Sequence, residues 1–158
     1  MSTPPMDPVD DTGLVCTCSA VRSAARRLTQ YYDEALKQTG LKVTQYGLMA
    51  NIAKLDRPSV TDLAERVAMD RTTLTRNLAP LRDAGWVDLA PGPDRRTRSV
   101  VLTASGWRIL DAARPHWRAA ETALRRKAGG DITTALHDVL VQTVSAAEAR
   151  QNEAQQNQ

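Results

Sequence analysis

The sequence predicts a mainly α-helical protein with a single small β-hairpin. Apolar residues make up 42% of the 158 residues, but there is no phenylalanine and only 4% of the residues are aromatic. The core must therefore consist mostly of leucine, valine and alanine, which suits helices. Apolar residues recur at the three- and four-residue spacing of amphipathic helices along most of the chain. Only near residue 92 do two β-branched or alternating segments flank a Pro-Gly-Pro turn, which is typical of a hairpin.

Four helices are predicted before the hairpin. Ser59, with Asp62 three residues later, forms a capping box, and Asp70 is a second N-cap. Gly85 is a stop signal at the end of the fourth helix. The predicted helices run from Leu14 to about Lys37, over 44–55, from Ser59 to an Ala-Met-Asp turn at 68–70, and from Asp70 to Gly85.

The hairpin is followed by two longer helices. WVDLA and TRSVVLT are the predicted strands, and PGPDRR between them forms a basic tip. Thr103 caps a helix over 104–127, the pair Gly129-Gly130 breaks it, and Asp131 starts a last helix. Residues 1–12 are predicted to be a disordered arm and 151–158 a disordered tail, because both are polar and lack an apolar pattern.

Two short helices joined by a tight turn and followed by a hairpin predict a winged helix-turn-helix domain. In this arrangement the second helix enters the major groove of DNA. Leu74, Leu78 and Leu81 form its inward stripe, so Thr72 and Arg76, about 200° away from Leu74, face outward. The candidate contacts to base edges and phosphates on this helix are Arg71, Thr72, Thr73, Thr75 and Arg76.

The hairpin tip carries three arginines within four positions, which repel one another unless an anion offsets their charge. Beside the recognition helix, Arg95 and Arg98 are expected to contact phosphates or a narrow minor groove. Asp94 is expected to pair with Arg96 and orient its guanidinium. The net charge of +3, concentrated over 91–127, also favours an anionic polymer. Double-stranded DNA is therefore the predicted partner.

From about residue 14 to residue 150 the chain resembles the MarR (multiple-antibiotic-resistance regulator) family. The resemblance is strongest in SVTDLAERVAMDRTTLTRNLAPLRDAGWV, in Asp94-x-Arg96 and in VVLTASG, whereas the short, proline-flanked LAPGPDRR departs from the family pattern. It implies a homodimer that binds a palindromic operator, usually as a repressor relieved by a small molecule or an oxidant. It also implies one MarR-like domain over 13–150, with dimerisation helices 14–38 and 104–149 and a winged helix-turn-helix over 44–103.

Two kinds of effector stay open at this point. One is a small aromatic or anionic ligand bound near Trp107 or Trp117, although both rings also suit a core or dimer contact. The other is an oxidant. A branch of the family that senses organic peroxides has a reactive cysteine near the start of the first helix, which Cys18 matches, and a tyrosine that Tyr32 matches. Cys16 lies on a different face from Cys18 and would at most be a resolving thiol. The alternative for these cysteines is a purely structural role as small buried apolar residues.

The remaining functional classes find little support in the sequence. We find no nucleophile–base–orienter set and no phosphate-binding loop, so we do not expect an enzyme or a cofactor. His116 and His137 lie apart from other ligating residues, which argues against a metal site. No segment approaches the roughly 18 apolar residues of a membrane span, and no signal peptide is recognisable, which favours a cytoplasmic protein. A non-specific architectural DNA-binding protein is the remaining alternative.

Overall fold

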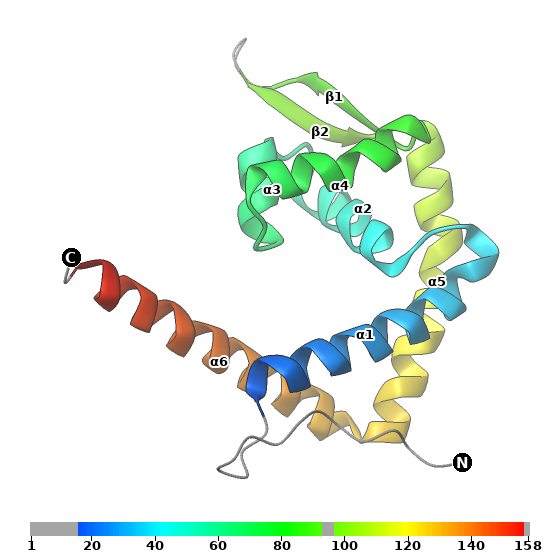
Figure 1. Cartoon of the computed structure of the whole chain (residues 1–158). Coiled ribbons are helices and arrows are strands. Elements are labelled where there is room, and N and C mark those ends of the chain that lie inside the picture. The colour runs from blue at the N-terminus through cyan, green and yellow to red at the C-terminus, as the bar shows by residue number, and fades with distance from the viewer. Residues whose placement is uncertain (1–15, 93–96, 157–158) are drawn as a thin grey trace. The chain divides into compact units, whose positions relative to one another are not determined.

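A computed structural model describes residues 16–92 and 97–156 of the chain. The predicted order of helices and strands is confirmed, with one short 3-10 turn added after the first helix (Figure 1). The elements are α1 (Thr17–Leu36), η1 (Lys37–Thr39), α2 (Val43–Leu55), α3 (Val60–Arg66), α4 (Arg71–Asp83), β1 (Val87–Pro91), β2 (Arg98–Leu102), α5 (Ala104–Ala128) and α6 (Gly130–Gln156). The chain divides within α5 into two compact units, Met1–Trp117 and Arg118–Gln158, which are described separately below.

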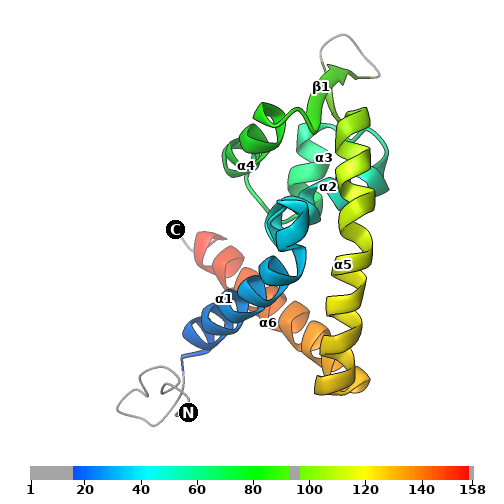
Figure 2. The same ribbon diagram turned by 90° about the vertical axis from the view of Figure 1, so that its right-hand side faces the viewer.

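The first unit has one continuous hydrophobic core, to which helices and strands all contribute. Its completely buried side chains include leucines from α1, α3, α4 and α5 together with Met49 and Ile52 of α2. Val87 of β1 and Val100 of β2 close the core from the hairpin side. Figure 2 shows α2 and α3 between α4 and the first half of α5, so that α4 lies on the outside of this unit. The composition argument for an aliphatic core is therefore confirmed.

The predicted helix boundaries in this unit follow local hydrogen bonds. Ser59 accepts the backbone N–H of Asp62 at 3.1 Å, and Asp62 accepts the backbone N–H of Ser59 at 3.1 Å, so the capping box is present. Gly85 adopts a left-handed conformation with φ of 70° just after α4, a region that glycine enters without steric penalty. Thr103 accepts the N–H of Gly106 at 3.0 Å and thereby caps α5.

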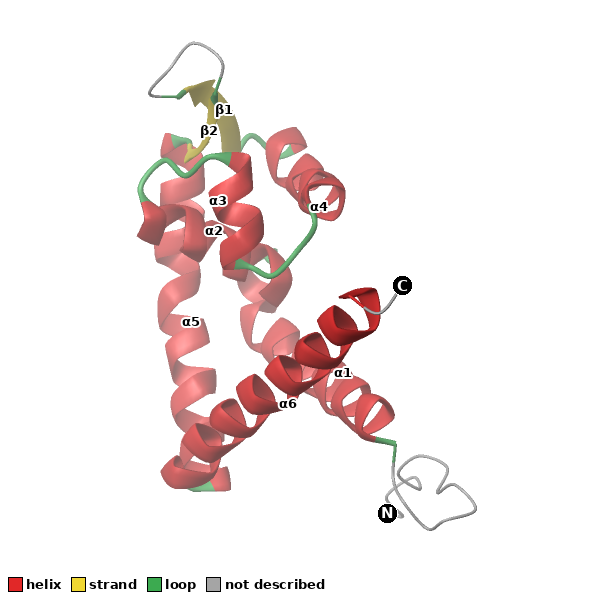
Figure 3. Cartoon of the chain, turned by 90° about the vertical axis from the view of Figure 1, so that its left-hand side faces the viewer, coloured by secondary structure: helices red, strands yellow, loops and turns green. Residues whose placement is uncertain are grey.

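The hairpin is the only sheet among the described residues (Figure 3). Its antiparallel register pairs Val87 with Leu102 and Pro91 with Arg98, and a backbone bond from Gly92 N–H to the Thr97 carbonyl at 2.9 Å extends it toward the tip. The other edge of β2 is joined by the segment before α3, where Ser59 bridges to Ser99. β2 is therefore paired along both of its edges, with β1 on one and the segment before α3 on the other.

The second unit consists of the end of α5 and all of α6. Gly129, with φ of 87°, separates the two helices as predicted, although α6 begins at Gly130 rather than at Asp131. One expectation is wrong here, because the backbone of 151–156 continues α6 instead of forming a disordered tail. Alanine, glutamate and glutamine are good helix formers, and no glycine or proline stops the helix before Gln156. The arm 1–12 and the start of the first helix at Leu14 lie outside the described residues.

Candidate nucleic-acid interface

The recognition helix α4 separates an apolar face from a polar face. Leu74 and Leu81 are completely buried and Leu78 almost completely, which fixes the rotation of α4 on the rest of the unit. On the opposite side the side chains of Arg71, Thr72 and Arg76 are exposed. A face with cations and a hydroxyl on a helix held this firmly is suited to contact phosphates and base edges.

The N-terminus of α4 is held by Asp70. Its carboxylate accepts the hydroxyl of Thr73 at 2.6 Å and the backbone N–H of Thr73 at 2.8 Å. The side-chain bond from Thr73, followed by the backbone bond from the same residue, holds the pKa of Asp70 below its usual value. Before this cap, Ala68 takes a left-handed conformation with φ of 51°, and Met69 N–H bonds to the Ala64 carbonyl at 2.9 Å. The turn between α3 and α4 is therefore tightly specified.

Two of the five predicted contacts on α4 also serve the helix itself. The hydroxyl of Thr73 donates to Asp70, and the hydroxyl of Thr75 donates to the Arg71 carbonyl at 2.7 Å. Their protons are therefore engaged inside the helix, and only their oxygens can accept a bond from another molecule. In the described part of the chain Thr72 has no side-chain hydrogen bond, so its hydroxyl can donate outward.

The wing presents Arg98 at the start of β2, where its side chain is exposed and Pro91 faces it across the hairpin. The next two residues, Ser99 and Val100, are both buried. Val100, which lies on the same face of β2 as Arg98, is completely buried, so Arg98 is exposed because it lies at the tip end of the strand, beyond the core. The predicted contacts Asp94, Arg95 and Arg96 lie outside the described residues, so the pairing of Asp94 with Arg96 stays a prediction.

Two anchoring contacts of the wing were not anticipated from the sequence. The hydroxyls of Thr103 and Ser105 both donate to the carbonyl of Gly85, at 2.6 and 2.7 Å, and tie α5 to the end of α4. A Cβ atom on Gly106 would collide with the carbonyl oxygen of Trp86. The glycine of the VVLTASG segment therefore allows α5 to approach the start of β1 closely. The only hint of this close approach in the sequence is the position of Gly106, just after a predicted strand and at the start of a predicted helix.

The candidate redox residues all lie on or beside α1. Cys16 is the N-cap residue of α1, with extended backbone, and Cys18 lies in the first turn; both are exposed free thiols. Tyr32 is half-buried and packs edge-to-face on Tyr31, with ring centroids 5.3 Å apart. Fourteen residues along one helix separate Cys18 from Tyr32 by about 21 Å, so the two side chains do not meet within one chain.

The two candidate ligand-binding tryptophans have different environments. Trp117 stacks on Tyr46, with ring centroids 5.6 Å apart, and forms part of the packing around the core. Trp107 is 42% exposed and lines a pocket of about 200 Å³ at the base of the wing, together with Arg57 and Leu102. A role in ligand binding stays a prediction for both residues. The described residues contain no group of three or more side chains able to hold a metal ion.

Comparisons with known proteins bear on this arrangement. Residues 39–97 match the family model described as the MarR family. The chain is 36% identical to the M. tuberculosis transcriptional regulator MosR in a crystal structure with DNA, with a TM-score of 0.74, and covers 98% of that chain and 85% of its own length. The chain belongs to the MarR family. In this MarR-family chain the matched segment contains α2, α3, α4 and β1, and β2 of the wing follows it directly. The relatives are transcriptional regulators rather than enzymes.

More distant similarities agree with this assignment. The fold is shared with E. coli MarR without ligand (20% identity, TM-score 0.63, covering 82% of this chain and 98% of that one). An uncharacterized HTH-type transcriptional regulator of Bacillus subtilis, YwoH, is 25% identical over 83 residues. This match spans 52% of the MarR-family chain and 61% of YwoH. None of the described helices is both long and apolar enough to cross a bilayer.

Proposed function

We propose that the chain is a homodimeric transcriptional repressor that binds palindromic double-stranded DNA and is released by a small aromatic or anionic molecule. The DNA-binding part of this proposal rests on the exposed face of α4, because Arg71, Thr72 and Arg76 lie opposite a buried leucine stripe. The crystal structure of MosR with DNA, at 36% identity, supports the same class of partner. Arg98, which is exposed at the tip end of β2, adds a second cationic contact.

Sequence-specific binding is tested with duplexes that the purified chain selects from a random-sequence pool. We expect the selected site to be palindromic, with half-sites about 34–36 Å apart, since a two-fold dimer presents two recognition helices. Fluorescence anisotropy at rising salt should show that the selected duplex stays preferred over a random one. Affinity that falls equally for both duplexes would indicate a non-specific architectural protein instead.

Substitutions on α4 separate base contacts from phosphate contacts. Thr72→Ala and Arg76→Ala should weaken binding to the selected duplex more than binding to random DNA. Arg82→Ala is the matched control, because Arg82 is also exposed on α4 but lies in its last turn. Equal losses on both duplexes would reassign Thr72 and Arg76 to the DNA backbone.

The dimer is proposed because two helices expose apolar faces. Val21 on α1 is 40% exposed, and α6 exposes several large apolar residues, namely Ile132, Leu136, Val139, Val141 and Val144. A second copy of the same chain supplies a matching apolar surface by two-fold symmetry. Sedimentation at micromolar concentration should find a dimer, which Leu136→Glu should weaken and Thr134→Glu, a polar site on the same helix, should not. A compact folded monomer of the wild-type chain would overturn the dimer.

Release by a small molecule is proposed on the basis of the pocket beside Trp107. An exposed indole can stack on an aromatic ring, and the guanidinium of Arg57 on the same wall can pair with a carboxylate. Titration of the protein–DNA complex with a panel of aromatic carboxylates should release DNA from the wild-type chain and not from Trp107→Ala. Release that is unaffected by this substitution would place the ligand elsewhere.

Oxidation of Cys18 is the second candidate for the release signal. Both thiols are exposed at the start of α1, which makes them accessible to an oxidant in solution. Oxidation to a sulfenic acid or a disulfide would add polar groups or a covalent link to a helix that we assign to the dimer. Peroxide treatment of cysteine variants distinguishes this signal from a ligand.

A further inference from the structure

The loop between α2 and α3 has an unusual backbone. Asp56 and Arg57 both adopt left-handed conformations, with φ of 48° and 63°. Residues with a Cβ atom rarely take such angles, and a residue that precedes a proline, as Arg57 does, is normally extended. Strain of this kind persists where the surrounding structure enforces it, and it frequently marks a functional position.

The surroundings of Arg57 are rigid on both sides. Before it, Asp56 ends α2; after it, Pro58 is buried and its carbonyl accepts the N–H of Val100 in β2 at 2.8 Å. Ser59 then bridges to Ser99, on the edge of β2 that β1 does not occupy. The Arg57 side chain therefore starts from an anchored backbone on one side of the wing.

The guanidinium of Arg57 reaches the opposite strand. Its Nη2 donates to the carbonyl of Pro91 at 3.3 Å, across 34 positions of sequence. Pro91 ends β1 and faces Arg98 in the hairpin register. The contact thus links the anchored loop to the strand pair from which Arg98 projects.

We propose that Arg57 is a positioning residue that fixes the direction in which the wing presents Arg98 to DNA. This inference rests on the proposed DNA-binding function. The backbone of Arg57 is left-handed and is followed by the anchored Pro58, and from this position its side chain contacts Pro91. An arginine suits this role, since it is long enough to cross a strand and its planar donors match a carbonyl.

Arg57→Gly provides a sharp test, because it removes the side chain and the backbone strain together. Glycine takes positive φ without a penalty, so the thermal unfolding midpoint of the variant should be equal to or higher than that of the wild type. Its affinity for the selected duplex should nevertheless fall by roughly threefold to tenfold, as a loosened phosphate contact in each subunit would cause. Lys54→Ala is the matched control, because Lys54 is an exposed cation in the last turn of α2.

A double-mutant cycle with Arg98→Ala tests the proposed route. If Arg57 acts through Arg98, adding Arg57→Gly to Arg98→Ala should cause almost no further loss of affinity. Additive losses would mean that Arg57 contacts DNA on its own and would overturn the proposal. So would an unchanged affinity of Arg57→Gly, or an equal loss with Lys54→Ala. If the wild-type chain selects no duplex at all, the DNA-binding function itself fails, which is a separate result.

Discussion

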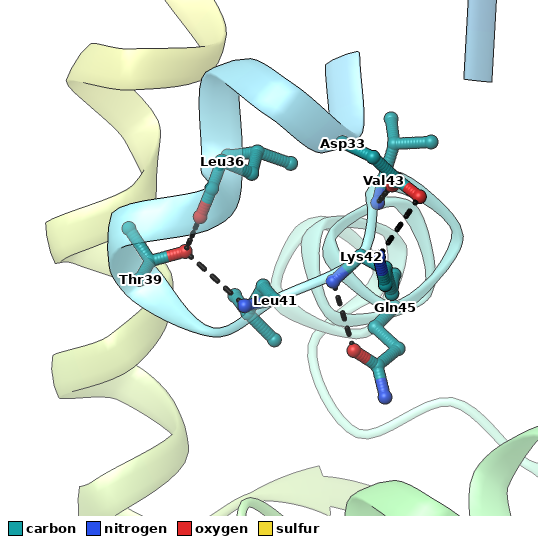
Figure 4. A network of polar contacts seen from close by, with 7 residues as sticks. All are labelled: Asp33, Leu36, Thr39, Leu41, Lys42, Val43 and Gln45. Atoms are coloured by element: carbon teal, nitrogen blue, oxygen red, sulfur yellow. Dashed lines mark hydrogen bonds and ion pairs between the residues drawn. The ribbon is translucent and has the colours of Figure 1, made fainter. Parts of the chain in front are cut away.

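Substitution of Asp33 tests how the chain joins α1 to the DNA-binding helices. The N-cap residue of α2 is Lys42, whose side chain cannot accept a hydrogen bond. Asp33 of α1 provides the missing acceptor: its Oδ1 accepts the backbone N–H of Val43 at 2.7 Å, and its Oδ2 pairs with the Lys42 ammonium at 3.4 Å (Figure 4). Asp33 therefore caps α2 from a different helix.

The size of the effect follows from these two contacts. Loss of an N-cap costs about 0.5–2 kcal/mol. A hydrogen bond to a charged group contributes about 1.5–3 kcal/mol, and the Asp33 side chain is only 22% exposed. The ion pair adds less than about 1 kcal/mol, because the ammonium of Lys42 is largely solvated. Asp33→Ala should therefore lower the free energy of unfolding by about 2 kcal/mol in total.

Thermal unfolding followed by circular dichroism measures this loss. A change of about 2 kcal/mol corresponds to a fall in the midpoint of roughly 4–8 °C for a chain of this length. Asp33→Asn keeps a neutral acceptor for Val43 N–H and loses the ion pair and the charge on the hydrogen bond, so its midpoint should fall by less than that of Asp33→Ala. Lys42→Met is the matched variant for the ion pair alone. If Asp33→Asn costs as much as Asp33→Ala, capping is not the main role of Asp33.

Three further predictions concern other parts of the first unit. Asp70→Asn should remove a pH dependence of the free energy of unfolding. Because the folded-state pKa of Asp70 is lowered, the stabilisation by its carboxylate is present above about pH 3.8 and is lost as the pH falls through the folded-state pKa. Free energies of unfolding that fall with pH in the same way for wild type and variant would contradict this. Gly106→Ala should lower the free energy of unfolding by about 1–3 kcal/mol, because the new methyl group meets the Trp86 carbonyl; urea denaturation of this variant beside Gly130→Ala, a site with open space, is the measurement. For the redox alternative, organic hydroperoxide should release the wild-type chain from DNA in a gel shift but not Cys18→Ser, whereas release of the Cys16→Ser/Cys18→Ser double variant would exclude both thiols.

Local chemistry made much of the fold predictable. The capping box of Ser59 and Asp62, the cap of Asp70 and the stop at Gly85 each depend on residues a few positions apart, so the sequence pattern contains them directly. The leucine spacing of α4 likewise predicted which of its faces is exposed. The recognition-helix half of the candidate site could therefore be located before the structure was known.

Contacts between distant segments were not predictable in this way. The bond from Val43 to Asp33 spans ten residues, and the bond from Arg57 to Pro91 spans 34. Such contacts depend on how helices and strands pack, and the flanking residues do not indicate them. The engagement of the Thr73 and Thr75 hydroxyls was also missed, because an outward-facing threonine can equally donate to its own helix.

The apolar face of α6 connects the stability of this helix with the proposed dimer. Twenty-seven helical residues extend about 40 Å, and Ile132, Val139 and Val144 on this helix are 61%, 56% and 55% exposed. Most helical stability in proteins comes from packing of an apolar face rather than from intrinsic propensity. An α6 without a partner would therefore be marginal in water, and burial against a second copy would stabilise both the dimer and the helix. Dissociation of the dimer by Leu136→Glu should then reduce the helical circular dichroism signal, while the leucine core of the first unit keeps α2, α3 and α4 folded. A monomeric variant with its full helical signal would show that α6 is stable by itself, and the exposed valines and isoleucine would then no longer argue for a dimer.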